Sequence, residues 1–271
     1  MYEFAVVSLI DVLGFSDLVK SSSYKKVSQT LTRFQEFSGA KETPKYDYSP
    51  EVYSFSDLII RIRKWKPSAK TMHPIGLLIL EIGDLQRTQA LLIDQNIFIR
   101  GAVTQGQIST SHNLVFGPAF LDAYTLESKF ATYPRIVVSE RALQDLQDTD
   151  KPLNECTDRS YDKELVQQML RQGEDGSWFI NYLYGIESDL ETSEAYIKFL
   201  IRHRDAIRLR SKKLTKAKKL TKTRELLKYQ WLVCYHNRRV DELEPEWLAE
   251  YDLDPDALKI SPKDTQFLYA F

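Results

Sequence analysis

Two aspartates occupy positions at which a carboxylate could bind a metal ion. Asp11 ends the apolar run 4–10, which is typical of a strand buried on both faces. Asp57 falls between the β-prone runs 48–55 and 58–62, which predict a tight hairpin. A charge at the exit of a buried strand is costly unless it is paired or binds a metal. Two converging carboxylates can hold two divalent cations, an arrangement that clamps the oxygens in a phosphoryl displacement.

The alternative interpretation of both aspartates is structural. An aspartate at the end of a strand is more often a helix cap or a turn residue than a metal ligand. The tripeptide Phe-Ser-Asp also occurs twice, at 15–17 and at 55–57. Asp17 fits the first turn of a helix, where the helix dipole favours a negative charge. Position alone therefore leaves the metal and turn interpretations of Asp11 and Asp57 open.

The elements around these aspartates predict one fold. Residues 15–37 are amphipathic, and residues 74–93 carry apolar side chains at helical spacing. A strand is predicted at 97–104, a short helix at 118–130 and another strand at 134–139. The order is β-α-β-β-α-β with a further helix and strand, the ferredoxin-like arrangement of the α+β class. In that sheet the first strand lies beside the hairpin, so the two aspartates are expected to converge.

The rest of the chain has a different character. Residues 178–184 predict one more strand, and 194–242 predict one very long helix or two in tandem, without Pro or Gly. We therefore divide the chain into a catalytic part, 1–188, and a helical C-terminal extension, 189–271. The extension carries a basic run that could bind nucleic acid, but we favour a solvated helix face because the run contains leucines and no aromatic residue. Its cations are Arg208, Arg210, Lys212, Lys213, Lys216, Lys218, Lys219 and Lys222.

Composition excludes several classes of protein. The 271 residues are 43% hydrophobic and 28% charged, with a formal net charge of -1, as in an ordinary globular protein. No run approaches the ~18 apolar residues of a membrane span, and the N-terminus lacks the basic region of a signal peptide, so we expect a cytoplasmic protein. Neither the cysteines nor the histidines show metal-ligand spacing. They are Cys156, Cys234, His73, His112, His203 and His236.

Four segments together resemble the class III nucleotidyl cyclases. Residues 10–16, Ile-Asp-Val-Leu-Gly-Phe-Ser, resemble their first metal-binding motif, and residues 53–57 occupy the place of the second. Residues 99–106 fall where the family has its fourth strand, and 116–127 resemble its next helix. The resemblance covers about residues 4–140. It implies a class III cyclase core with an appended helical C-terminal region.

This resemblance also implies a site. Two divalent cations, Mn²⁺ or Mg²⁺, would be held by Asp11, Asp57 and the carbonyl of Val12. Gly14 leads into a helix N-terminus whose amides suit phosphate oxygens. Phe15 would cover the ribose, although an ordinary packing role for this ring remains open.

Some positions depart from the purine cyclases. The base-reading position holds Tyr53, and the places of a ribose-orienting Asn and a transition-state Arg hold Leu121 and Thr125. Charge develops on the phosphates during cyclisation, so a cation is needed, and Arg100 is the candidate. Tyr53 could instead be a plain cross-strand aromatic residue, and Arg100 a surface strand residue.

With its aromatic residue at the base position, the chain is most similar to the Pycsar pyrimidine cyclases. That resemblance implies a homodimer, with active sites at the interface, that converts UTP to cyclic UMP, or CTP to cyclic CMP. It also implies a separate effector protein that binds the product in bacterial anti-phage defence. The alternatives are a catalytically degenerate cyclase domain that senses a nucleotide or binds a protein, and a nucleic-acid-binding protein.

Overall fold

The protein is described by a computed structural model that covers residues 1–39, 48–66, 76–111, 114–148, 159–216 and 223–261. Its central strand, β1 (Glu3–Val12), lies between β3 (Leu58–Lys64) and β4 (Ile99–Ser111) and is antiparallel to both. Strand β2 (Glu51–Phe55) extends the sheet beyond β3. Outside the described residues lie His73, His112, Cys156, Lys218, Lys219 and Lys222.

The order β2-β3-β1-β4 is the ferredoxin-like order, so the predicted α+β fold is confirmed. Helices α1 (Phe15–Ser21) and α2 (Tyr24–Phe37) connect β1 to β2, and α3 (Gly76–Ile93) connects β3 to β4. Each crossover skips one strand, because β3 inserts between β1 and β2 while β1 inserts between β3 and β4. This interleaving brings the end of β1 beside the β2–β3 hairpin.

The sheet continues past β4. Helix α4 (Pro118–Phe130) leads to β6 (Ile136–Val138), which is parallel to β4 and is followed in the sheet by β8 (Trp178–Ile180) and β7 (Leu170–Gln172). The remaining elements of this part are β5 (Leu114–Phe116), α5 (Glu140–Asp148), α6 (Arg159–Met169), α7 (Tyr182–Gly185) and the 3-10 helix η1 (Ile186–Asp189).

Several predicted elements were wrong in extent, and the strand predicted over 97–104 continues to Ser111. The helix predicted over 15–37 is two helices, because the chain is extended at Ser22 and Ser23 before α2 begins. The strand predicted over 178–184 ends at Ile180, and the aromatic residues that follow form α7. An apolar run of this length is compatible with either a strand or a buried helix, and here Tyr182 and Leu183 are buried on a helix.

Two hydrophobic cores cover the two faces of the sheet. The larger one contains Val6 and Ile10 of β1 together with residues of α3, α7 and the C-terminal helices. The smaller one contains Ala5, Val7 and Leu9 of the same strand and is covered by α4. Successive side chains of β1 alternate between the two cores. The strand is therefore buried on both faces, as its continuous apolar sequence predicts.

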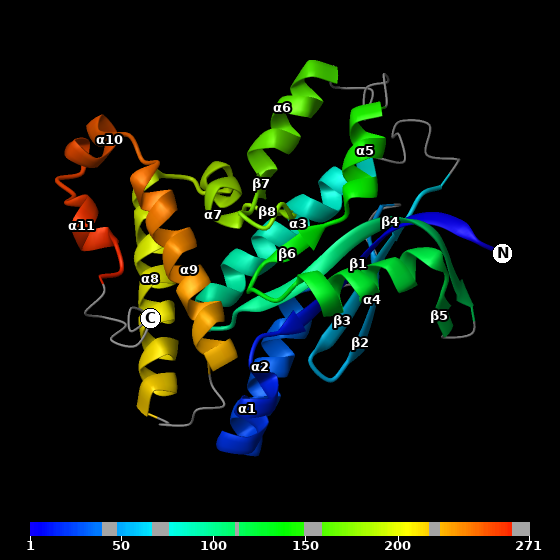
Figure 1. The fold of residues 1–271 in the computed structure, drawn as a ribbon, viewed down its shortest axis with the longest axis horizontal. Helices are drawn as coiled ribbons and strands as arrows, with labels where there is room; N and C mark the ends of the chain where they lie inside the picture. The colour runs from blue at the N-terminus through cyan, green and yellow to red at the C-terminus, as the bar shows by residue number, and fades with distance from the viewer. Residues whose placement is uncertain (40–47, 67–75, 112–113, 149–158, 217–222, 262–271) are drawn as a thin grey trace.

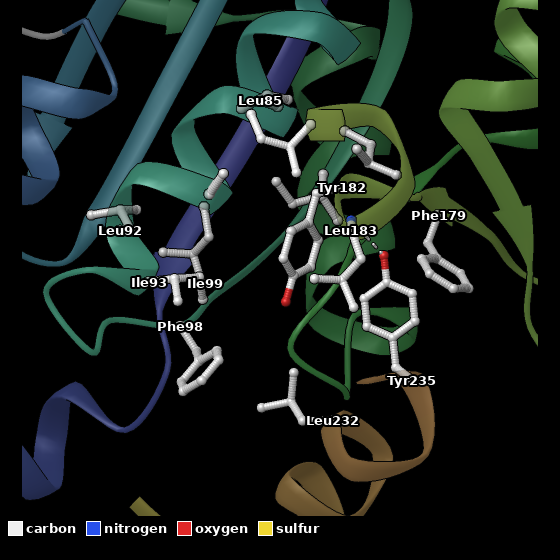
Figure 2. Close-up of a cluster of buried hydrophobic side chains, with 14 of the residues drawn as sticks. Leu85, Leu92, Ile93, Phe98, Ile99, Phe179, Tyr182, Leu183, Leu232 and Tyr235 are labelled. Carbon is white, nitrogen blue, oxygen red and sulfur yellow. Dashed lines mark hydrogen bonds between the residues drawn. The ribbon is translucent and has the colours of Figure 1, made fainter. Parts of the chain in front are cut away.

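The C-terminal region begins with two long helices that lie side by side, α8 (Ser193–Lys216) and α9 (Thr223–Asp241), followed by α10 (Pro245–Glu250) and α11 (Pro255–Leu258) (Figure 1). Of the two alternatives for 194–242, the structure therefore has two helices. Figure 2 shows Tyr235 of α9 beside Leu183 of α7, whose N–H donates to the tyrosine hydroxyl at 3.1 Å. The division of the chain at residue 188 stays a prediction. Within the described ranges, every helix falls short of the length or apolar character that crossing a bilayer requires.

Candidate active site

The carboxyl groups of Asp11 and Asp57 meet at one end of the sheet. Phe55 pairs with Leu58, which leaves a two-residue turn, Ser56 and Asp57, at the tip of the hairpin. Ser56 adopts a φ of 57°, the left-handed conformation that tight hairpins require at a turn position. Asp11 pairs with Leu58 across the β1–β3 ladder, and its carboxyl group lies within hydrogen-bonding reach of Asp57. The predicted convergence of the two aspartates is thus present in the structure.

The carboxyl groups of Asp11 and Asp57 repel each other when both are ionised. Burial raises the pKa of Asp11, the hydrogen bond and negative charge of Asp57 add to this effect, and Arg100 opposes it, which together place the pKa at about 7. Asp11 therefore holds its proton up to nearly neutral pH when no other cation is close, because a second negative charge beside Asp57 is unfavourable. A divalent cation would relieve the same repulsion, so the chemistry of the pair fits a metal site. In the part of the chain that the structure describes, no group of three or more His, Cys, Asp or Glu side chains could hold a metal ion.

The loop after β1 is fixed by backbone contacts. Val12 N donates to the carbonyl of Asp57 at 3.3 Å, and Leu13 N donates to the carbonyl of Phe98 at 2.8 Å. Gly14 then adopts a φ of 72°, a conformation that costs glycine little, and α1 begins at Phe15. The Phe15 ring packs against the large core, as its alternative interpretation predicts. A contact of Phe15 with ribose, and the roles of Val12 and Gly14, stay predictions.

Arg100 is held by three different groups. Its Nε lies 3.2 Å from Oδ2 of Asp11, the residue opposite it in the β1–β4 ladder. Its Nη1 donates to the carbonyl of Ala131 at 3.1 Å, and its Nη2 lies 2.7 Å from Oε1 of Glu127 on α4. Arg100 is therefore a partly buried ion-pair partner of Asp11 rather than a free surface cation. Sequence reasoning missed Glu127. The one indication of its role is that an acidic residue falls on the buried side of an amphipathic helix.

Tyr53 lies on the same face of the sheet as Asp11. Its ring packs against the small core, beside Leu58 and Ile60, and its hydroxyl donates to Oε2 of Glu51 at 3.1 Å. Burial and the neighbouring Glu51 carboxylate both raise the pKa of Tyr53. Asp11 follows Leu9 by two residues, so strand alternation places it on this face as well. The expected base-reading residue and the expected metal ligand Asp11 thus share one side of the sheet.

The two departures on α4 are both exposed. Leu121 is 63% exposed, and Thr125 also lies on the outer side of the helix, whereas Ala119 and Ala123 are buried against the small core. Neither Leu121 nor Thr125 offers a cation to a phosphate group.

The basic run of the C-terminal region has mixed roles. Arg210 donates through Nε and Nη2 to the carbonyl of Asn96 at 3.0 and 2.7 Å, and Arg208 donates to the carbonyl of Lys259 at 3.3 Å. Both arginines tie α8 to neighbouring segments. Lys212 and Lys213 are exposed, which agrees with the solvated helix face that we favoured.

No family model matches the sequence, and no curated protein matches it. Among solved structures, the guanylyl cyclase Cya2 shares 13% identity at a TM-score of 0.41, covering 53% of this chain and 78% of its own. The adenylyl cyclase CyaB from P. aeruginosa shares 14% identity at a TM-score of 0.41, covering 55% and 83%. The adenylate/guanylate cyclase/hydrolase from Silicibacter pomeroyi shares 14% identity at a TM-score of 0.39, covering 66% and 95%. At these identities the similarity concerns the arrangement of strands and helices.

Proposed function

We propose that this protein is a metal-dependent nucleotidyl cyclase. The observation that supports the proposal most is the meeting of Asp11 and Asp57 at the end of β1, where burial and the neighbouring carboxylate raise the pKa of Asp11 and positive charge would stabilise the pair. The local sequences around both residues are those that resemble the metal motifs of class III cyclases. A structural turn role for these aspartates does not account for two partly buried like charges placed side by side.

The reaction follows from the chemistry of such a pair. Asp11, Asp57 and the Val12 carbonyl would hold two Mn²⁺ or Mg²⁺ ions, which supply charge for the triphosphate and lower the pKa of the ribose 3′-hydroxyl when bound. The 3′-hydroxyl gives its proton to solvent, its oxygen attacks the α-phosphorus in line, a new P–O bond forms, and the bond to pyrophosphate breaks. Arg100 holds Asp11 in place through its Nε, and the backbone amides of the β1–α1 loop would bind the phosphates.

We further propose that the substrate is a pyrimidine nucleotide, UTP in the first place and CTP as the alternative. Tyr53 occupies the base-reading position with a bulky ring whose hydroxyl is fixed by Glu51. A fixed aromatic residue there leaves less room for a purine. By the resemblance stated above, the product would be a second messenger of anti-phage defence that acts on a separate effector.

A homodimer belongs to the same proposal. Large apolar side chains remain exposed on the hairpin tip, β5 and α4, with Phe55 at 81%. They are Phe55, Leu114, Phe116, Leu121, Tyr124 and Phe130. Exposed apolar surface of this kind is typical of a protein–protein interface, and a second chain would complete a site that opens beside it. Sedimentation or light scattering of the purified protein tests this state directly.

The decisive experiment is turnover of ATP, GTP, CTP and UTP with Mn²⁺, with products separated by chromatography. We expect cyclic UMP or cyclic CMP from the wild type and none from Asp57→Ala. Asp17→Ala is the matched control, since Asp17 also follows Phe-Ser but lies on α1. A cyclic purine product would contradict the proposed role of Tyr53 but would support the proposal that the protein is a cyclase. Nucleotide binding without turnover would favour the degenerate sensor, which the residues Leu121 and Thr125 also suit.

A further inference from the structure

Helix α9 packs against both segments that flank the candidate active site. The ring of Tyr229 meets Phe98 edge-on, with centroids 6.0 Å apart, and the carbonyl of Phe98 accepts the N–H of Leu13 in the β1–α1 loop. The ring of Trp231 stacks on Tyr133 with centroids 5.9 Å apart. One side of α9 therefore lies against the segment before β4, which is hydrogen-bonded to the loop after β1, and against the loop after α4.

Lys228 lies on this inward side of α9. At about 100° per residue, its side chain is roughly 60° from Trp231 and 40° from Leu232 around the helix. Leu232 is fully buried, and Figure 2 shows it on the side of α9 that faces Phe98. Lys228 itself is partly buried, one residue before the tyrosine that contacts Phe98.

The charge of Lys228 acts on the candidate site. Burial lowers the pKa of Lys228, the positive charge of Arg100 lowers it further, and the carboxylates of Glu225 and Asp11 oppose both effects. None of the ion pairs formed by the described residues involves Lys228. A lysine that is near a metal-binding pair and has no ion-pair partner can still bind an anion.

Other cations of the site are already engaged. Arg100 is bound to Asp11, Glu127 and the carbonyl of Ala131. Helix α4 carries Thr125 where an arginine would stabilise the transition state. Cyclisation moves negative charge onto the pyrophosphate, which needs a preorganised cation in addition to the metals.

We propose that Lys228 of α9 binds the β- and γ-phosphates of the nucleotide, so that the C-terminal helices form part of the active site. This inference rests on the proposed function. Its ammonium group would hold the triphosphate in the ground state and the leaving pyrophosphate in the transition state. The exposed Arg224, one turn earlier on the same helix, adds positive charge at the approach to the site.

The test compares Lys228→Gln and Lys228→Arg with Arg238→Gln, an exposed cation near the other end of the same helix. For Lys228→Gln we expect kcat/KM to fall by about tenfold to 100-fold, the range for one hydrogen bond to a charged group. Inhibition by pyrophosphate should weaken by a similar factor, inhibition by the cyclic product should stay unchanged, and Lys228→Arg should recover most of both losses. Arg238→Gln should behave as the wild type, and unchanged melting temperatures establish that the variants fold.

Two outcomes separate this inference from the proposed function. If the wild type is a cyclase and Lys228→Gln has the same kcat/KM and the same affinity for pyrophosphate, Lys228 has no part in phosphate binding. If the wild type turns over no nucleotide, the cyclase proposal fails. Calorimetry with Mn²⁺ and pyrophosphate then tests whether Lys228 contributes to pyrophosphate binding. Equal affinity of the wild type and Lys228→Gln in that titration overturns the inference.

Discussion

Arg100 Nε lies 3.2 Å from Oδ2 of Asp11, so the expected transition-state cation is paired with an expected metal ligand. The same guanidinium lies 2.7 Å from Glu127 Oε1. An arginine shared between two carboxylates holds both in fixed orientation. Arg100 thus fits a positioning residue for the metal site better than a group that contacts the phosphates.

Replacing Arg100 should therefore act through Asp11. In Arg100→Gln, the loss of the positive charge raises the pKa of Asp11 further, so metal binding has to compete with a more tightly held proton. We expect the pH at which Mn²⁺ half-saturates the protein to move upward, and activity near neutral pH to fall by at least tenfold. Titrations of Mn²⁺ at several pH values measure the shift, and an unchanged pH profile would contradict the positioning role.

Metal-free stability should also depend on Asp11. Because its pKa is raised from 3.8 to about 7, protonated Asp11 contributes stability that is full below about pH 3.8, declines as pH rises above it and is lost once pH passes about 7. Mn²⁺ should then raise the melting temperature more at pH 8 than at pH 6. In Asp11→Asn, both the pH dependence in this window and the effect of Mn²⁺ should largely vanish. Equal stabilisation at both pH values would argue against metal binding at this pair.

The ferredoxin-like core could be predicted from sequence because its signals are local. Pro118 after Gly117 begins α4, and the predicted bounds 118–130 agree with the structure. Asp11 and Asp57 could be brought together from strand order alone. The break between α1 and α2 could not be predicted, since Ser22 and Ser23 are not strong helix breakers.

The surroundings of the two aspartates were less accessible to sequence reasoning. The contact of Arg100 with Glu127 depends on where α4 crosses the sheet. The place of Lys228 depends on how α9 docks against Phe98 and Tyr133. Neither docking has a local sequence signal, because packing geometry arises from contacts between segments far apart in the chain.

The buried cluster formed by Glu81, Arg61 and Arg63 should contribute strongly to the free energy of unfolding. Glu81 of α3 is 0% exposed and lies 2.7 Å from Arg61 Nε and 3.0 Å from Arg63 Nη2. Glu81→Gln leaves two buried arginines with less compensation, and we expect a loss of about 3–5 kcal/mol in the free energy of unfolding. Asp84→Asn, at a carboxylate 39% exposed, should cost less. Urea denaturation at pH 7 measures both, and equal losses would contradict the ranking.

The same cluster predicts behaviour in acid. Although burial opposes ionisation, Arg61 and Arg63 lower the pKa of Glu81 from 4.5 to about 2. A lowered carboxyl pKa contributes stability that is present above about pH 4.5 and is lost as pH falls towards 2. Wild-type unfolding free energy should therefore decline between pH 5 and pH 3 more steeply than that of Glu81→Gln. Parallel pH profiles would show that Glu81 does not carry this dependence.

A second buried pair predicts a decline in stability at mildly acidic pH. Nδ1 of His203 lies 3.0 Å from Nδ1 of His236, Nε2 of His203 lies 2.6 Å from the Tyr182 hydroxyl, and Nε2 of His236 lies 3.0 Å from the carbonyl of Leu258. One neutral tautomer on each ring satisfies all three contacts, with a single proton between the two Nδ1 atoms. A second proton there would place two buried donors face to face.

Protonation should therefore loosen the packing of α8 on α9. Burial lowers the pKa of His236 from 6.5 to about 4 and lowers that of His203 as well. Depressed histidine pKa values mean that stability is full above about pH 6.5 and is lost as pH falls towards 4. Wild-type unfolding free energy should decline between pH 7 and pH 5, and His203→Gln should be less stable at pH 7, by about 1–3 kcal/mol, with a flatter profile. Denaturation curves across this range decide the matter, because a wild type with constant stability from pH 7 to pH 5 would show that the pair does not control it.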